Sequence, residues 1–158
     1  MGVEIERKFL VDHAAWQKLD KPQGIHYKQG YILSDDKRTV RVRIAGGHGY
    51  ITLKGALEGR MSRSEYEYEI PVADAGEILK AFTNNGTEKI RYRIPAGDFT
   101  WEVDEFSGDN AGLIVAEIEL KSENDKFEKP GWIAEEVTDD YRYANSNLAV
   151  HPYKDWGK

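Results

Sequence analysis

Charged and apolar residues alternate in several separate stretches of this chain, and this pattern constrains the fold more than any other feature. In the first stretch, residues 3–11, the side chains of Glu4, Glu6 and Lys8 share one face of an extended strand. Apolar residues occupy the opposite face, with Arg7 as the one interruption. In a single strand this pattern is ordinary and indicates one buried and one solvated face. Its repetition along the chain calls for a further explanation.

The alternation predicts eight strands joined by turns rich in Gly, Asn, Asp and Pro. The predicted strands cover residues 3–11, 26–33, 39–44, 50–54, 63–70, 88–94, 99–106 and 113–120. Helical spacing and capping residues predict short helices at 12–19, 73–82 and 139–149, and one helical turn at 132–137. No linker or repeat divides the 158 residues, so we expect a single domain, residues 1–158, of mainly β (α+β) class.

The polar faces of the predicted strands carry ions sorted by sign. Pairs of like charge two residues apart are Glu4/Glu6, Glu65/Glu67, Glu102/Asp104, Glu117/Glu119, Arg41/Arg43 and Lys89/Arg91. Like charges in these positions repel modestly, so a solvated surface gives no reason to repeat the choice. A bound polyanion with its metal ions gives such a reason. Closing the sheet into a barrel would place the ions around a central space and leave the apolar face outside, under the helices.

Composition excludes several classes of protein. The chain has no cysteine, which excludes disulfides and thiolate metal sites, and its net charge of −6 argues against nucleic acid as a partner. No apolar run is long enough to span a bilayer, and the N-terminus lacks the apolar core of a secretory signal. We therefore expect a cytoplasmic protein that binds neither nucleic acid nor a membrane.

The order of these motifs resembles the CYTH superfamily, the triphosphate tunnel metalloenzymes. Its hallmark is Glu4-x-Glu6-x-Lys8, and the similarity continues through QGYI, VRVR, ITLKG, RSEYEYEI, EKIRYRI, WEVDEF, AEIEL and EVTDDYRYAN. A lone ExExK would be weak support, but the full set covers almost the whole chain. The resemblance implies a closed eight-stranded antiparallel β-barrel, the tunnel, with a few short helices packed outside.

The resemblance also implies roles for the charged residues. The side chains that would bind a triphosphate are Lys8, Arg41, Arg43, Lys54, Lys89 and Arg91. The carboxylates at metal positions would be Glu117 and Glu119 with Asp104, and a second metal position would draw on Glu4, Glu6 and Glu67. Mg²⁺ or Mn²⁺ suits such oxygen ligands. Lys8 or Tyr31 is the candidate for moving a proton.

Further charged residues have supporting or open roles. Arg63, Glu65 and Arg93 share the charged faces and would keep the other charges oriented. Arg142 would either reach a tunnel mouth or pair with a carboxylate. We also expect that crowding of like charges raises the pKa of at least one of Glu117 and Glu119 in the metal-free protein.

The start EIERKFLV is most similar to the inorganic triphosphatases of the family. This implies metal-dependent hydrolysis of inorganic triphosphate, a small-molecule partner, to pyrophosphate and phosphate. The alternatives are a class IV-type adenylate cyclase or a thiamine or nucleoside triphosphatase on the same fold, and a non-catalytic polyphosphate-binding module. The acidic pairs argue against the module, because a pure anion binder has no use for them. The choice of metal and the existence of a homodimer stay open.

Overall fold

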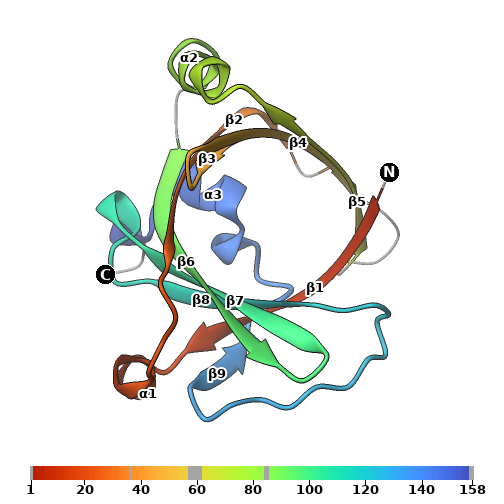
Figure 1. The fold of residues 1–158 in the computed structure, drawn as a ribbon, viewed down its shortest axis with the longest axis vertical. Helices are drawn as coiled ribbons and strands as arrows, with labels where there is room; N and C mark the ends of the chain where they lie inside the picture. Colours follow the sequence, from red (N-terminus) through yellow and green to blue (C-terminus); the bar gives the residue numbers. More distant parts are fainter. Residues whose placement is uncertain (1, 36, 57–61, 84–85, 157–158) are drawn as a thin grey trace.

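The computed structural model describes residues 2–35, 37–56, 62–83 and 86–156, and its central feature is a closed antiparallel barrel (Figure 1). The barrel strands are β1 (Gly2–Val11), β2 (Ile25–Ser34), β3 (Arg38–Ala45), β4 (His48–Ala56), β5 (Ser62–Ile70), β6 (Gly86–Ala96), β7 (Phe99–Phe106) and β8 (Ile114–Glu119). They are hydrogen-bonded in the order β5-β4-β3-β2-β6-β7-β8-β1, and a β5–β1 pairing closes the ring. The eight predicted strands and the closed barrel are confirmed.

Two helices cover the outside of the barrel. Helix α1 (His13–Lys18) and helix α2 (Val72–Phe82) lie where helices were predicted. Helix α2 contacts β3 and β4. It approaches them so closely that a Cβ atom added at Gly49 would lie 2.8 Å from the Cβ of Ala75. Glycine at this position therefore lets α2 rest directly on the sheet.

A ninth strand corrects one prediction. Residues 132–137 do not form a helical turn, because β9 (Ile133–Glu136) pairs antiparallel with the end of β1. Strand β5 pairs with β1 only over residues 2–5, which leaves backbone groups further along the same edge of β1 without partners. Strand β9 supplies them, and the Arg7–Glu136 ion pair ties the two strands together. The need to satisfy an open sheet edge outweighs the local helical pattern.

The C-terminal helix also differs from its prediction. In place of one helix over 139–149, the chain forms a 3₁₀ turn, η2 (Tyr141–Tyr143), and then α3 (Asn145–Val150). Figure 1 shows α3 behind the open centre of the barrel and not on its outer surface. Two further 3₁₀ turns are η1 (Gly108–Asn110) and η3 (Tyr153–Asp155).

Two apolar clusters hold the barrel and its covering together. Outside β1, β7 and β8, a cluster built on Phe9, Trp16, Trp101 and Trp132 packs ring edges against ring faces at centroid distances of 5.3–5.8 Å. The second cluster contains Phe106, Leu113 and Val115 around Leu148 of α3. Phe106 and Val115 continue the inward-facing rows of β7 and β8, so this second cluster closes one end of the barrel.

Asp12 begins α1, and its removal should measurably weaken the fold. Its carboxylate accepts a hydrogen bond from the backbone N–H of Ala15 at 3.0 Å, and the six-residue helix carries the fully buried Trp16. Asp12→Ala should lower the free energy of unfolding by about 1 kcal/mol, the usual cost of losing an N-cap. Urea denaturation measures this loss. The exposed Asp20→Ala is the matched control and should stay within about 0.5 kcal/mol of wild type; equal losses in both variants would contradict the capping role.

Candidate active site

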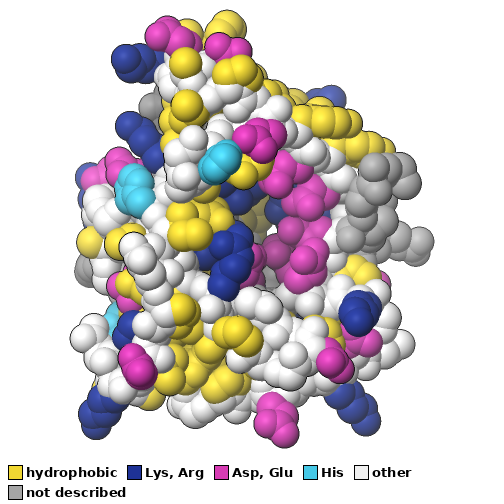
Figure 2. Space-filling model, viewed as in Figure 1, with side chains coloured by type: hydrophobic (Ala, Val, Ile, Leu, Met, Phe, Trp, Pro, Cys, Tyr) yellow, Lys and Arg dark blue, Asp and Glu magenta, His cyan; other side chains and the backbone are white. Residues whose placement is uncertain are grey.

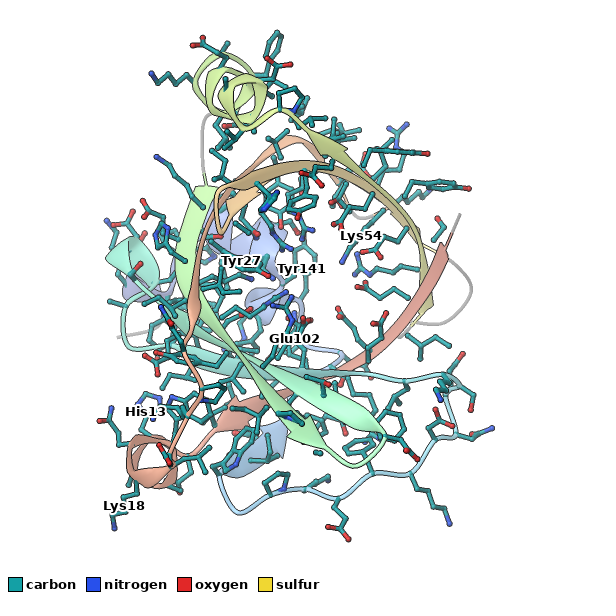
Figure 3. All side chains as sticks on the ribbon, in the orientation of Figure 1. His13, Lys18, Tyr27, Lys54, Glu102 and Tyr141 are labelled. Carbon is teal, nitrogen blue, oxygen red and sulfur yellow. The ribbon has the colours of Figure 1, made fainter. Side chains whose placement is uncertain are left out.

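The barrel interior is lined by the charged faces that the alternation predicts. Strand pairing places Arg91 opposite Asp104, Glu102 opposite Glu117 and Lys8 opposite Glu117. Figure 2 shows the resulting hollow, with Lys and Arg side chains gathered on one side of the opening and Asp and Glu side chains on the other. In Figure 3, Tyr27 and Lys54 extend into the barrel from different sides.

Charge is layered along the barrel from the closed end to the open end. Beside the apolar closure lies fully buried Lys89, paired in register with Phe106. The next residues of the inward rows are Arg91, Asp104 and Glu117, all buried. Glu102 is half-buried and Glu119 is exposed, so the acids come into contact with water toward the open end.

Asp104 clamps two cations at the closed end. Its oxygens accept hydrogen bonds from Arg91 Nε at 2.7 Å, Arg91 Nη2 at 2.9 Å and Lys89 Nζ at 2.7 Å. Burial alone would raise the pKa of Asp104, but the charges of Arg91 and Lys89 outweigh it and lower the pKa well below its usual range. Both oxygens are thus already engaged. A role for Asp104 as a metal ligand stays a prediction and would require it to release one of these partners.

Arg43 is a buried cation of a different kind. The side chain is 8% exposed, and its Nε donates to Gln29 Oε1 at 2.8 Å. Within the described residues no carboxylate pairs with it. Burial, together with the nearby charges of Arg41 and Arg91, lowers the pKa of Arg43 to about 9, so it stays protonated at neutral pH. A buried, unpaired guanidinium is costly in an empty protein and favourable once an anion arrives.

One interior cavity of about 60 Å³ brings several of the predicted site residues together. It is lined by Glu6, Lys8, Tyr31, Arg41 and Lys54. Lys8 Nζ donates to the backbone oxygen of Tyr143 at 3.2 Å, and Lys54 Nζ lies 2.9 Å from Glu4 Oε1. Burial lowers the pKa of Lys54, but the carboxylates of Glu4 and Glu6 outweigh it and raise the pKa. The two candidates for moving a proton, Lys8 and Tyr31, thus share a cavity with substrate-binding candidates.

Four acidic residues, which we call the acidic wall, line one side of the interior: Glu4, Glu6, Glu117 and Glu119. Burial first, and then the charges of Glu117 and Glu4, raise the pKa of Glu6 well above its usual range, and a side-chain hydrogen bond with Glu117 adds to the shift. Burial and the charges of Glu4, Glu65 and Glu102 raise the pKa of Glu119. This agrees with the expectation for one member of the Glu117/Glu119 pair.

Glu117 behaves in the opposite way. Burial pushes its pKa up, but the charge of Lys8 and the hydrogen bond from Glu6 outweigh burial and lower the pKa of Glu117 to about 2. Arg91 adds to this effect from 3.7 Å. Two neighbouring carboxyl groups are thus shifted in opposite directions: the pKa of Glu117 falls and the pKa of Glu6 rises.

The carboxylate chemistry fits a divalent cation, although no ligand cage stands ready. Among the described residues, no three Asp, Glu or His side chains are already gathered at metal-binding positions. Glu6 and Glu119 nevertheless lie opposite each other on paired strands, and Glu117 is two residues from Glu119 on the same face. A cation bound there would offset the repulsion that raises the pKa of Glu6. Glu67 lies apart from them. It accepts from Thr52 at 2.9 Å and lies 3.8 Å from Arg41.

The supporting residues divide into those inside the barrel and those outside it. Arg63 lines the same cavity as Lys8, and Glu65 lies 3.7 Å from Lys54 Nζ. Arg93 donates to the Tyr27 hydroxyl at 3.0 Å and pairs with Glu102 at 3.1 Å. Arg142 pairs with Asp140 at 2.6 Å on an exposed surface, which favours the carboxylate-pairing alternative for this residue.

Sequence reasoning missed several residues of the interior. Tyr27 and Gln29 lie on the same face of β2 as Tyr31, and both are buried. Tyr27, Gln29 and Tyr31 are spaced two residues apart, so the sequence places them on one face of the strand. Because Tyr and Gln are uncharged, the pattern of charges did not identify this face as part of the interior. Asn145, whose Oδ1 accepts from Lys89 Nζ at 3.2 Å, gave no local signal, because its position depends on where the C-terminal segment folds.

Comparison with known families identifies the fold and its lineage. The CYTH domain family model matches residues 2–153. The chain belongs to the CYTH domain family. CYTH tunnel enzymes of this type depend on a metal ion, in agreement with the acidic wall.

Individual relatives of this CYTH chain are similar over nearly their full length. It is 53% identical to an inorganic triphosphatase of Acetivibrio thermocellus over 157 residues, which cover 99% of each chain. It is 38% identical to an inorganic triphosphatase of Nitrosomonas europaea over 93% of this chain and 97% of the relative.

Solved structures show the same architecture. A crystal structure of an inorganic triphosphatase, 33% identical, superimposes with a TM-score of 0.65 over 95% of this chain and 96% of that one. A protein of Pyrococcus horikoshii, 25% identical, has a TM-score of 0.59 over 77% of this chain and 80% of that one.

Proposed function

We propose that this CYTH protein hydrolyses inorganic triphosphate to pyrophosphate and phosphate, using a divalent cation. The observation that carries the proposal is Arg43, a buried guanidinium that pairs with no carboxylate in the described part of the chain. It lies near Arg41 and Arg91, so an anion that reaches Arg43 is also attracted by two further guanidinium groups. The two relatives named inorganic triphosphatase support the same substrate.

The basic residues would bind and orient the phosphate chain. Arginine forks hold phosphate oxygens in pairs, whereas Lys8 and Lys54 act as adjustable point charges. Asp104 holds Arg91 in a fixed orientation, so little rearrangement is needed when charge develops on the transferred phosphoryl group. The apolar closure around Leu148 keeps bulk water from the innermost end.

The acidic wall would hold the cation, with Glu117 and Glu119 as ligands and Glu4, Glu6 and Glu67 available for a second position. Mg²⁺ or Mn²⁺ is the proposed metal, because all of these ligands are oxygen atoms. When bound, the cation would polarise the terminal phosphoryl group and neutralise its charge. Lys8 and Tyr31 remain the proposed residues for moving a proton, since both line the cavity beside Glu6.

Substrate comparison tests the proposal. We expect kcat/KM for inorganic triphosphate to exceed that for ATP by about tenfold or more, roughly 1.4 kcal/mol, because a nucleoside removes charge from one end of the phosphate chain. Phosphate release from triphosphate, ATP, GTP and thiamine triphosphate, each with Mg²⁺ or Mn²⁺, measures the difference. Equal turnover of ATP, or formation of cyclic AMP, would instead support a nucleotide-directed enzyme. Binding without turnover of any of the four would support the polyphosphate-binding module.

Location and assembly remain predictions. No helix in the described part of the chain is long and apolar enough to cross a membrane. We propose a cytoplasmic protein whose partner is the small triphosphate, with neither nucleic acid nor a membrane bound. For the homodimer, outward-facing Leu53, Tyr66 and Tyr68 on β4 and β5 are 36–58% exposed and offer an apolar face. Light scattering would show whether two copies associate.

A further inference from the structure

The buried cations of the barrel are held in two different ways. Arg91 is held by Asp104, a carboxylate that also neutralises it. Arg43 is held by uncharged groups: its Nε donates to Gln29 Oε1 at 2.8 Å, and its guanidinium carbon lies 4.7 Å from the centre of the Tyr27 ring. The protein thus fixes one guanidinium by an ion pair and the other by neutral contacts.

Tyr27 serves more than one cation. Its ring centre lies 5.0 Å from the guanidinium carbon of Arg91 and 5.9 Å from Lys89 Nζ, and its hydroxyl accepts from Arg93. A ring face attracts cations through its quadrupole without cancelling their charge. The ring therefore lets the Arg43 guanidinium lie close to two other cationic side chains without cancelling its charge, whereas Asp104 pairs with both Arg91 and Lys89.

Gln29 is a buried polar residue that uses only part of its hydrogen-bonding capacity. It is 1% exposed, and within the described residues its Nε2 has no hydrogen-bond partner. An unpaired buried amide is unfavourable, and a leucine or methionine would fill the same space without that cost. What a glutamine adds at this position is a neutral acceptor for Arg43.

We propose that Gln29 and Tyr27 are positioning residues, which fix the Arg43 guanidinium for phosphate binding without neutralising it. The inference rests on the proposed function, since it assigns the free charge of Arg43 to the triphosphate. It explains why neutral residues stand between basic ones in a barrel where carboxylates are abundant. A carboxylate at position 29 would hold Arg43 equally well and would take away the charge that the substrate needs.

Gln29→Glu tests this directly because it keeps the shape and adds one negative charge. The ligand-free variant should melt at the same temperature as wild type or higher, because the unpaired Arg43 gains an ion-pair partner. Its dissociation constant for inorganic triphosphate should rise about tenfold or more, because the pair opposes the anion. Titration calorimetry in EDTA measures the affinity without turnover, and a thermal melt in the same buffer measures the stability.

A second variant and a control complete the test. Gln29→Met keeps the length of the side chain but leaves Arg43 Nε without its acceptor, which offsets the benefit of removing the unpaired amide. It should also weaken triphosphate binding, without the gain in melting temperature. Exposed Gln17→Glu on α1 adds the same charge far from the barrel interior and should match wild type in both measurements. Wild-type affinity in Gln29→Glu, or affinity lost together with a lower melting temperature, would overturn the inference. A wild-type protein that neither binds triphosphate in EDTA nor hydrolyses it with Mg²⁺ or Mn²⁺ would instead refute the proposed function.

Discussion

Arg43→Met should lower kcat/KM for triphosphate by about 30- to 1,000-fold, or ~2–4 kcal/mol, while leaving the ligand-free protein nearly as stable as wild type. The loss follows from removing a charge-assisted contact to phosphate inside a barrel where water screens little. Stability should stay within about 1 kcal/mol of wild type or rise, because methionine keeps most of the apolar stem and removes a buried cation without a counterion. Steady-state kinetics and a thermal melt in EDTA measure the two effects.

Arg38→Met is the matched control for this variant. Arg38 lies at the start of the same strand, its side chain is 68% exposed, and it pairs with Asp35 at 3.3 Å. Removing it should change neither kcat/KM nor stability by more than about 0.5 kcal/mol. A wild-type rate in Arg43→Met would place the guanidinium outside the substrate site, and a large loss of stability would mean that it serves the fold instead.

Glu119→Gln should reduce metal-dependent hydrolysis by about 100-fold or more, roughly 2.7 kcal/mol, and slightly raise the melting temperature of the metal-free protein. The rate falls because one oxygen ligand loses its charge. The melting temperature rises because Glu119 stands among Glu4, Glu65 and Glu102, which repel its ionised form. The gain should be small, because the side chain is exposed and water screens the repulsion.

The pH dependence of this gain separates charge repulsion from packing. The fold raises the pKa of Glu119, so the ionised side chain destabilises the folded state above its folded pKa. The gain in Glu119→Gln should therefore be present at neutral pH and disappear as the pH falls through the raised pKa toward the ordinary value of about 4.3. Melts in EDTA across this range check it. A gain that persists in acid would mean that packing and not charge repulsion raises the melting temperature, and near-normal turnover would contradict a metal site at Glu119.

The charged alternation was sufficient to predict the strands and their two faces because sidedness in a strand has period two. The closed eight-stranded barrel was implied by the resemblance to the CYTH superfamily. Once Glu4, Glu6 and Lys8 are assigned to one face, every later pair of like charges has a definite side. Closing the sheet then follows from the unfavourable alternative of repeated like-charge pairs in water. The strand positions, to within two residues at each end, and the shared face of Lys89 and Arg91 could therefore be predicted from local pattern alone.

Features that depend on distant pairing could not be predicted in this way. Strand β9 forms because β1 extends beyond the residues that pair with β5. This depends on the register of β1 and β5, which the sequence of residues 132–137 does not reveal. The position of α3 across one barrel end depends on Leu148 finding Phe106 and Val115, which come from other strands. Tertiary contacts override local preference in both places.

The chemistry of the site was only partly visible in the sequence for a related reason. Alternation identifies which residues face inward, but not which ones pair. In the sequence, Asp104 could not be distinguished from the other acidic residues. In the structure, its three hydrogen bonds from Arg91 and Lys89 distinguish it from Glu117 and Glu119. Gln29 and Tyr27 carry no charge and became recognisable only through their contacts with Arg43.

The most direct test of the account is the product balance of wild-type protein with inorganic triphosphate, followed by ³¹P NMR with Mg²⁺ or Mn²⁺ and again with EDTA. The account predicts equal amounts of pyrophosphate and phosphate with the cation, and no turnover with EDTA, because the basic residues bind the substrate and the acidic wall must hold the metal. Turnover that continues unchanged in EDTA, or intact triphosphate with both cations, would contradict it.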